Sequence, residues 1–170
     1  MKKNTIDITK MGHKILDTPT LNVVLYQPEI PSNTGSIARM CGAAELRLHL
    51  IHPLGFKVDD KHLKRAGLDY WYEVDIHHHD SFKEFLNNEV RVETQIISFS
   101  RFADPVYTES EIVHGAYLLF GQETKGLPDE IRERFPCYRI PIWGRVRSLN
   151  LATTVGIVSY HYLHKLGCFG

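Results

Sequence analysis

Short apolar runs recur along this chain, and segments with helical spacing of apolar residues separate them. The runs cover residues 21–26, 46–51, 70–76, 95–100, 117–120 and 138–142. Runs of this length that are rich in β-branched and aromatic residues are typical of buried strands. Because strands alternate with helices, the sequence predicts an α/β fold with a mainly parallel sheet flanked by helices.

The helices expected between these runs cover residues 33–44, 60–66, 82–86, 128–134 and 149–166, with a helical turn at 107–112. Polar residues precede three of them and are predicted to cap them, namely Ser32 or Asn33, Asp80 or Ser81, and Ser148. The helix at 60–66 is short and basic. No apolar run approaches the roughly 20 residues that span a bilayer, so no membrane segment is expected.

The 170-residue length is enough for one domain and too short for two ordinary ones. We expect a single domain over residues 21–170, preceded by a flexible tail over residues 1–20. Lys and Arg together equal Asp and Glu in number, so net charge neither supports nor excludes a nucleic-acid partner. Three cysteines without metal-type spacing predict reduced thiols and a cytoplasmic protein.

Three polar turns follow apolar runs directly. They contain residues 31–35, 120–128 and 143–150, and glycine or asparagine occurs in each. In parallel sheets, ligands bind beyond the carboxyl ends of strands, and exposed N–H groups at helix starts favour anions and polar ligands. From the residues alone, the chain is expected to bind something small and polar, with phosphate or adenosine nearby.

Other chemistries find little support. The sequence contains neither a P-loop nor a GxGxxG motif, which makes ATP and NAD poor candidates. Residues 77–80 read HHHD, but consecutive side chains point in different directions and seldom bind one ion together. We expect this segment to be an exposed loop, and we expect no metal site.

The polar turns together resemble the three motifs of the SPOUT methyltransferases. The matching residues are PSNTG at 31–35 with Arg39, LFGQETKGLP at 119–128, and IPI at 140–142 with SLNL at 148–151. The segment KHLKRAGLDY at 61–70 is similar to the branch that methylates the ribose 2′-oxygen of the wobble nucleotide of tRNA, of cytidine or uridine type. The resemblance covers about residues 21–167.

This resemblance implies a fold, a cofactor and partners. The C-terminal part of the sheet is expected to form a deep trefoil knot that binds S-adenosylmethionine, with S-adenosylhomocysteine as the product. The substrate is expected to be tRNA and the enzyme a homodimer. Members of this branch consist of the catalytic domain alone, in agreement with the length of this chain.

The resemblance also assigns residues. Those expected to be catalytic are Arg39, Ser148 and Asn150. Those expected to bind the cofactor are Phe99, Gly121, Glu123, Gly126, Ile140, Ser148 and Leu149. Those expected to bind RNA are Asn33, Lys64, Arg65, Arg145, Arg147 and Tyr160.

Each of these residues also has a plainer interpretation. Gly121 and Gly126 suit any turn, Ser148 any helix cap, and Arg39 any helix surface. Because a guanidinium does not readily lose a proton, Arg39 is a poor base. Our hypothesis is that Arg39 grips the adjacent phosphate and positions the hydroxyl for an in-line displacement.

Three alternatives stay open at this stage. The first is a 2′-O-methyltransferase for another tRNA site or for rRNA. The second is a non-catalytic RNA-binding protein of the same fold. The third is an α/β nucleotide-binding protein outside the family.

Overall fold

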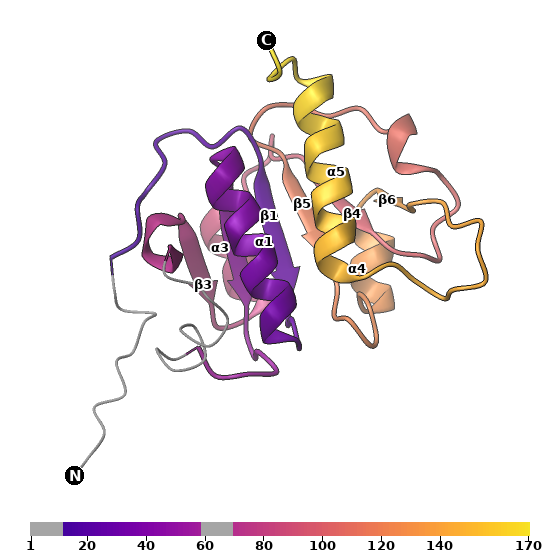
Figure 1. Cartoon of the computed structure of the whole chain (residues 1–170), viewed down its shortest axis with the longest axis horizontal. Coiled ribbons are helices and arrows are strands. Elements are labelled where there is room, and N and C mark those ends of the chain that lie inside the picture. Colours follow the sequence, from indigo (N-terminus) through magenta and orange to yellow (C-terminus); the bar gives the residue numbers. More distant parts are fainter. Residues whose placement is uncertain (1–11, 59–69) are drawn as a thin grey trace.

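A parallel sheet forms the centre of the molecule, shown here by a computed structural model that describes residues 12–58 and 70–170 (Figure 1). Within these residues the sheet has six strands in the order β3-β2-β1-β5-β4-β6, and every neighbouring pair is parallel. The strands are β1 (Asn22–Tyr26), β2 (Arg47–Ile51), β3 (Ile76–His79), β4 (Ile96–Phe99), β5 (Tyr117–Phe120) and β6 (Cys137–Tyr138). The predicted α/β class with a mainly parallel sheet is confirmed.

Helices cover both faces of this sheet. In the view of Figure 1, α1 (Pro31–Ala44) and α5 (Leu151–Lys165) lie in front of the sheet, and α3 (Phe82–Glu89) and α4 (Asp129–Arg134) lie behind it. Helices α1 and α5 also contact each other. Two short 3-10 helices, η2 (Trp71–Glu73) and η3 (Tyr107–Glu109), lie in the connections.

The central strands β1 and β5 are apolar at nearly every position because both of their faces are covered. In β1, Val23 and Leu25 belong to the core cluster under α1 and α5, whereas Val24 belongs to the cluster that contains Phe85 of α3 and Ile131 of α4. Successive side chains of a strand point to opposite faces, so a central parallel strand needs apolar residues at every position. This explains the continuous apolar runs of the sequence.

The strand expected at residues 70–76 is wrong, and so is the exposed loop expected at 77–80. Residues 71–73 form η2 with Trp71 buried, and the three histidines lie in β3 instead. The aromatic run has strand-like composition, but Leu48 donates its backbone N–H to the carbonyl of Asp75, which aligns the following residues with β2. His79 is buried, and burial lowers its pKa.

Local caps explain where the helices begin. The side chain of Ser81 accepts a hydrogen bond from the N–H of Glu84 at 3.1 Å, which confirms one predicted cap of α3. Two other predicted caps are wrong. The N-cap of α1 is Ile30, whose aliphatic side chain cannot accept a capping bond. The N-cap of α5 is Asn150, two residues after Ser148.

The last strand is shorter than predicted. In place of residues 138–142, β6 covers only two residues, and a single further bridge joins Arg139 to Val106. Pro141 lacks the N–H that would continue the ladder. The basic helix expected at 60–66 lies outside the described residues.

Part of the expected tail contacts the sheet. Residues 1–11 lie outside the described residues, but Leu16 donates its N–H to the Asp75 carboxylate at 3.1 Å and accepts a bond from Arg47 at 2.6 Å. His13 contacts the carbonyl of Trp71. Among the helices that the structure describes, none has the length and apolar content required to cross a membrane.

Candidate functional site

The central strands finish at the same level. Phe120 of β5 pairs with Leu25 of β1 and with Phe99 of β4, and Phe99 pairs with Tyr138 of β6. The rings of Phe99 and Phe120 stack with their centroids 4.8 Å apart. The loops that follow these strands therefore leave the sheet on the same side, at the carboxyl ends of the strands, where ligands of parallel sheets bind.

The loop after β5 is closed by its two glycines. Gln122 and Gly126 exchange backbone hydrogen bonds of 3.1 and 2.9 Å. A Cβ at Gly121 would lie 2.2 Å from the carbonyl carbon of Gly126 and 2.3 Å from the nitrogen of Leu127, so no other residue fits there without a backbone shift. Gly126 has a φ of +70°, a conformation that favours glycine. Both positions are therefore fixed by backbone geometry.

The Glu123 carboxylate joins this loop to the segment that enters α1. It accepts hydrogen bonds from the N–H of Glu29 at 2.7 Å and from the N–H of Ile30 at 3.1 Å. The Glu29 carboxylate in turn accepts bonds from the N–H and hydroxyl of Thr124. A carboxylate at the start of a helix is also favoured by the helix dipole.

Two asparagines extend these bonds to the third loop. The Nδ2 of Asn33 donates to Glu123 at 3.2 Å, and the Oδ1 of Asn33 accepts from Asn150 at 2.8 Å. The Oδ1 of Asn150 caps α5 by accepting from the N–H groups of Ala152 and Thr153. One chain of hydrogen bonds, Glu123–Asn33–Asn150, therefore connects all three predicted turns, and we call it the amide chain.

Arg39 lies on the exposed side of α1, close to an aromatic ring. Its guanidinium carbon is 5.4 Å from the centroid of the Tyr70 ring, within the range of a cation–π contact. The Tyr70 hydroxyl donates to the carbonyl of Gly35, one turn before Arg39. Tyr70 thus contacts both the backbone of α1 and the side chain of Arg39, leaving the guanidinium accessible to a ligand.

The loop between β6 and α5 carries exposed polar and basic residues. Arg145, Arg147 and Ser148 are exposed, and Ile140 and Leu149 are half-buried. Arg101 donates to the carbonyl of Arg147 at 3.4 Å, which ties this loop to the one after β4.

The structure does not bring every predicted residue to the amide chain. Phe99 has its ring in the core, so its backbone is what faces the loops. Tyr160 is half-exposed on α5, about 15 Å along the helix axis from Asn150. Lys64 and Arg65 lie outside the described residues.

Sequence reasoning missed two contributors. Glu29 lies in the QPEIP segment, and its reciprocal bonds with the loop after β5 come from a contact between residues far apart in sequence. Tyr70 was assigned to a strand. Pro28 and Pro31, which flank Glu29, end the apolar run of β1, but no neighbouring residue indicates the contact with Thr124.

Fold and site together define a class of protein. Glycine and amide groups from three loops meet beyond the carboxyl ends of parallel strands, which is how α/β proteins bind small polar ligands. Comparison with known proteins then identifies the family. The sequence model of the family described as "SpoU rRNA Methylase family" matches residues 20–160 of this chain.

Curated relatives agree with this match. The tRNA (cytidine(34)-2'-O)-methyltransferase of Yersinia pestis is 43% identical over 153 residues, covering 86% of this chain and 94% of that protein. The protein of the same name from Escherichia coli (strain K12) is 41% identical over 150 residues, again covering 86% of this chain and 94% of the relative.

A solved structure agrees as well. It is described as "Structural insights into the 2-OH methylation of C/U34 on tRNA", is 47% identical, and superposes with a TM-score of 0.82 over 88% of this chain and 98% of that chain. The chain belongs to the SpoU rRNA methylase family, and the predicted resemblance to the SPOUT methyltransferases is confirmed.

Proposed function

We propose that this protein transfers the methyl group of S-adenosylmethionine to the ribose 2′-hydroxyl of the wobble nucleotide, cytidine or uridine, in tRNA. Family membership supports methyl transfer, and the names of relatives that are 41–43% identical over most of the chain support the tRNA substrate. The observation that carries the proposal is the amide chain, because it assembles the three family motifs at one edge of the sheet.

The loops fit the proposed cofactor. The backbone around Gly126 is open, with no atom within 4 Å of where a Cβ would lie, so a flat adenosine group can approach it. We propose that Phe99, Gly121, Gly126, Ile140 and Leu149 line this site mainly through backbone groups. Glu123 orders the loop, and Ser148 offers an exposed hydroxyl.

In this reaction the main role of the protein is to position the 2′-hydroxyl and the methyl donor. S-adenosylmethionine, when bound, supplies an electrophilic methyl group to an in-line displacement. Arg39 stays charged, so its proposed role is to hold the neighbouring phosphate through two parallel hydrogen bonds and thereby orient the 2′-hydroxyl. Tyr70 restrains the Arg39 guanidinium through its ring. In this proposal the hydroxyl proton goes to the phosphate or to water.

The amide chain modifies one expected role. Asn33 is buried and both ends of its side chain are engaged, so we propose that it positions Asn150 and does not contact RNA itself. Asn150 then orients the loop that carries Ser148. The proposed RNA contacts are Lys64, Arg65, Arg145, Arg147 and Tyr160.

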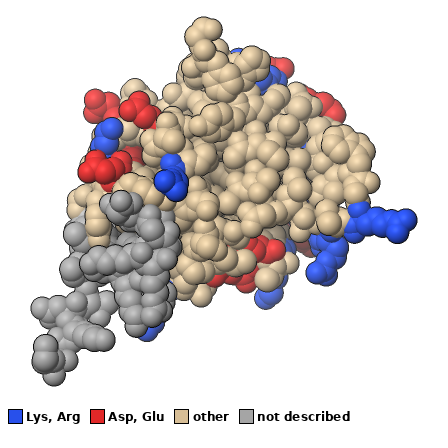
Figure 2. Space-filling model, viewed as in Figure 1, with Lys and Arg blue, Asp and Glu red and all other residues tan. Residues whose placement is uncertain are grey.

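We further propose that the enzyme acts as a homodimer with a trefoil-knotted C-terminal region in the cytoplasm, and that residues 21–170 form its single catalytic domain. The face of α1 and α5 carries few charged side chains, and most Lys and Arg side chains in this view lie towards its margin (Figure 2). Ile157 exposes apolar surface on α5, in keeping with a second copy packing there.

A pair of synthetic RNAs tests the reaction directly. Anticodon stem-loops carrying either a ribose or a 2′-deoxyribose at the wobble nucleotide are incubated with the protein and S-adenosylmethionine labelled in its methyl group. The proposal predicts label only in the ribose form and at least a tenfold lower rate for Arg39→Lys, which keeps the charge but loses the planar fork. Equal labelling of both RNAs would rule out the wobble 2′-hydroxyl. Label that enters only rRNA would favour the alternative rRNA activity.

A further inference from the structure

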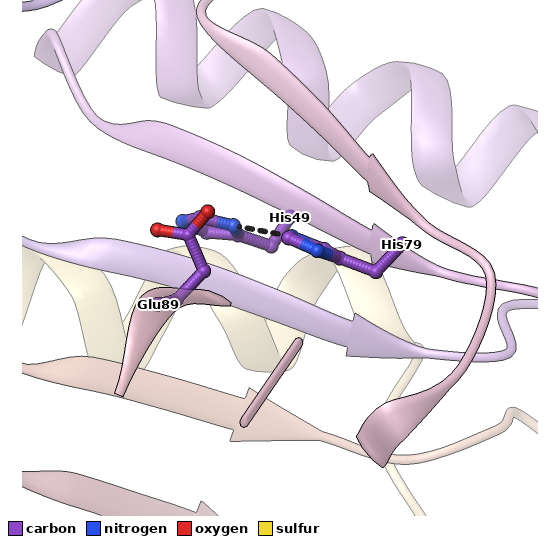
Figure 3. A group of neighbouring side chains, drawn as sticks. All are labelled: His49, His79 and Glu89. Carbon is purple, nitrogen blue, oxygen red and sulfur yellow. Dashed lines mark hydrogen bonds between the residues drawn. The ribbon is translucent and has the colours of Figure 1, made fainter. Parts of the chain in front are cut away.

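Two buried histidines and a carboxylate meet on the face of the sheet covered by α3. They are His49 of β2, His79 of β3 and Glu89, the last residue of α3 (Figure 3). One ligand atom of each lies within 4.8 Å of the others. His49 is fully buried and His79 is nearly so. The strand register explains the meeting, because His49 and Ile51 point to the same face as their partners His77 and His79.

The hydrogen bonds of His49 leave a lone pair directed at its neighbours. Its Nε2 lies 3.3 Å from the Oδ1 of Asn22, whose Nδ2 donates to the carbonyl of Gly115. An amide oxygen accepts, so the proton of His49 belongs on Nε2. The Nδ1 of His49 is then an acceptor, 2.9 Å from the Nε2 of His79. A metal-bound histidine typically donates its other N–H to such an oxygen.

Glu89 lies where a negative charge needs compensation. It is the C-terminal residue of α3, the helix end at which the dipole disfavours a carboxylate. Its side chain is only 19% exposed; it lies 3.9 Å from the Nδ1 of His77 and accepts a 3.4 Å hydrogen bond from the hydroxyl of Tyr117. The nearby charge of Arg47 is already paired with the buried Asp75 at 2.7 Å.

We propose that His49 Nδ1, His79 Nε2 and the Glu89 carboxylate bind one divalent transition-metal ion, with Zn²⁺ the best match. Two imidazole nitrogens and a carboxylate, completed by a water molecule, form a known four-coordinate zinc set. A tetrahedral ion with bonds of about 2.0–2.1 Å holds its ligand atoms roughly 3.3 Å apart. The hydrogen-bonded nitrogens at 2.9 Å therefore need to separate only slightly, and Glu89 must move inward.

Neither histidine loses a net proton when the metal binds. In the metal-free pair, the Nε2–H of His79 donates to His49. When an ion takes the place of that proton, His79 carries its hydrogen on Nδ1 and His49 keeps its hydrogen on Nε2, towards Asn22. Glu89 and His77 are partly exposed, so an ion can reach the cluster from their side.

The ion would cross-link β2, β3 and the end of α3. The three ligands lie on the face of the sheet covered by α3, whereas Asn33 and Asn150 of the amide chain lie at the starts of α1 and α5 on the other face, so the inference stands whether or not the proposed methyl transfer is correct. It departs from the expectation that residues 77–80 bind no metal. Only His79 of that run takes part, and the other two ligands come from distant positions in the sequence.

Direct titration of the untagged full-length protein tests the site. The protein is stripped with a chelator, returned to chelator-free buffer and titrated with Co²⁺ or Zn²⁺ alone. The expected result is one ion per chain, a visible absorption spectrum of tetrahedral Co²⁺, and a higher unfolding temperature with Zn²⁺. Absence of saturable binding in this protein would overturn the proposal.

Matched variants locate the ion. Glu89→Gln and His79→Gln are expected to weaken binding by more than the roughly 10- to 100-fold that follows loss of an outer-shell partner. The control is His78→Gln, in the same strand, whose ring pairs with His52 at 2.9 Å on the opposite face. Far-ultraviolet circular dichroism checks that each variant folds. Loss of binding in His78→Gln with retention in the other two would assign the ion elsewhere and contradict the proposal.

Discussion

The side-chain amide of Asn150 donates to the side-chain oxygen of Asn33 at 2.8 Å, across 117 positions of sequence. Asn150 also caps α5, and Asn33 also bonds Glu123. The buried Asn33 side chain thereby aligns the start of α1, the loop after β5 and the start of α5. Because buried polar groups are costly when unpaired, loss of either partner disturbs more than one loop.

Replacement of Asn150 can separate its two roles. Serine also caps helices, but its short side chain cannot both cap α5 and reach Asn33. Asn150→Ser is expected to keep the unfolding free energy within about 1 kcal/mol of the wild type, whereas Asn150→Ala loses roughly 1 kcal/mol more through the missing cap. Both are expected to reduce S-adenosylmethionine affinity, measured by calorimetry. Full affinity in Asn150→Ser would show that the bond to Asn33 does not shape the site.

A double-mutant cycle tests whether Asn33 and Asn150 act as a unit. The unfolding free energies of Asn33→Ala, Asn150→Ala and the double variant are compared by urea denaturation. Contacting residues in one network typically couple by roughly 0.5–3 kcal/mol, and we expect a value in that range. Additive losses would mean that the two amides contribute independently.

The glycine after β5 is expected to be irreplaceable for steric reasons. A Cβ at Gly121 would lie 2.2 Å from backbone atoms, so Gly121→Ala must push the loop open, at a cost of at least roughly 1–3 kcal/mol in unfolding free energy. Gly144→Ala is the matched control because its Cβ would meet no atom within 4 Å. Equal unfolding midpoints for the two variants in urea would refute the close packing of this loop.

Alkaline pH is expected to destabilise the fold through Tyr162. Burial raises the pKa of Tyr162 to about 12 from its ordinary value near 10, so the unfolded chain releases this proton first as the pH rises. The stabilisation by the neutral phenol is complete below pH 10 and is lost between about pH 10 and 12. Tyr162→Phe should therefore show a shallower fall in unfolding free energy over this interval. Parallel curves for variant and wild type would contradict it.

Salt dependence of tRNA binding tests the proposed basic contacts. Each neutralised phosphate contributes about −0.7 to −0.9 to the slope of log K against log salt concentration. Arg145→Ala and Arg147→Ala are each expected to weaken binding and to reduce the slope by about 1. Arg91→Ala, which removes an exposed arginine from the turn before the amino end of β4, should change neither value. A slope that stays the same in both loop variants would exclude these arginines as phosphate contacts.

Sequence predicted those features that depend on neighbouring residues. The run at 117–120 forms a strand because apolar residues at every position suit a sheet covered on both faces, and Ser81 caps α3 because its partner is three residues away. The prediction of a strand at 70–76 was wrong for a related reason. Aromatic and β-branched residues suit a strand, yet Trp71 is buried in a 3-10 helix. Because Asp75 pairs with β2, the strand begins only after it and contains the histidines.

Long-range contacts lie beyond such reasoning. The motif residues Asn33, Glu123 and Asn150 were identified through resemblance, but their hydrogen bonds to one another depend on the order of the strands. The assignment of the α5 cap to Ser148 failed because both Ser148 and Asn150 are good caps, and the bond to Asn33 favours the second. The meeting of His49 with His79 likewise follows from the register of β2 and β3.

Nucleoside mapping by mass spectrometry tests the central claim most directly. Bulk tRNA is incubated with the protein and S-adenosylmethionine labelled in its methyl group, digested, and mapped to individual positions. The account predicts one new 2′-O-methyl group, confined to a wobble cytidine or uridine and absent when Arg39→Ala replaces the wild type. Label at any other tRNA position, or an unchanged yield with Arg39→Ala, would contradict it.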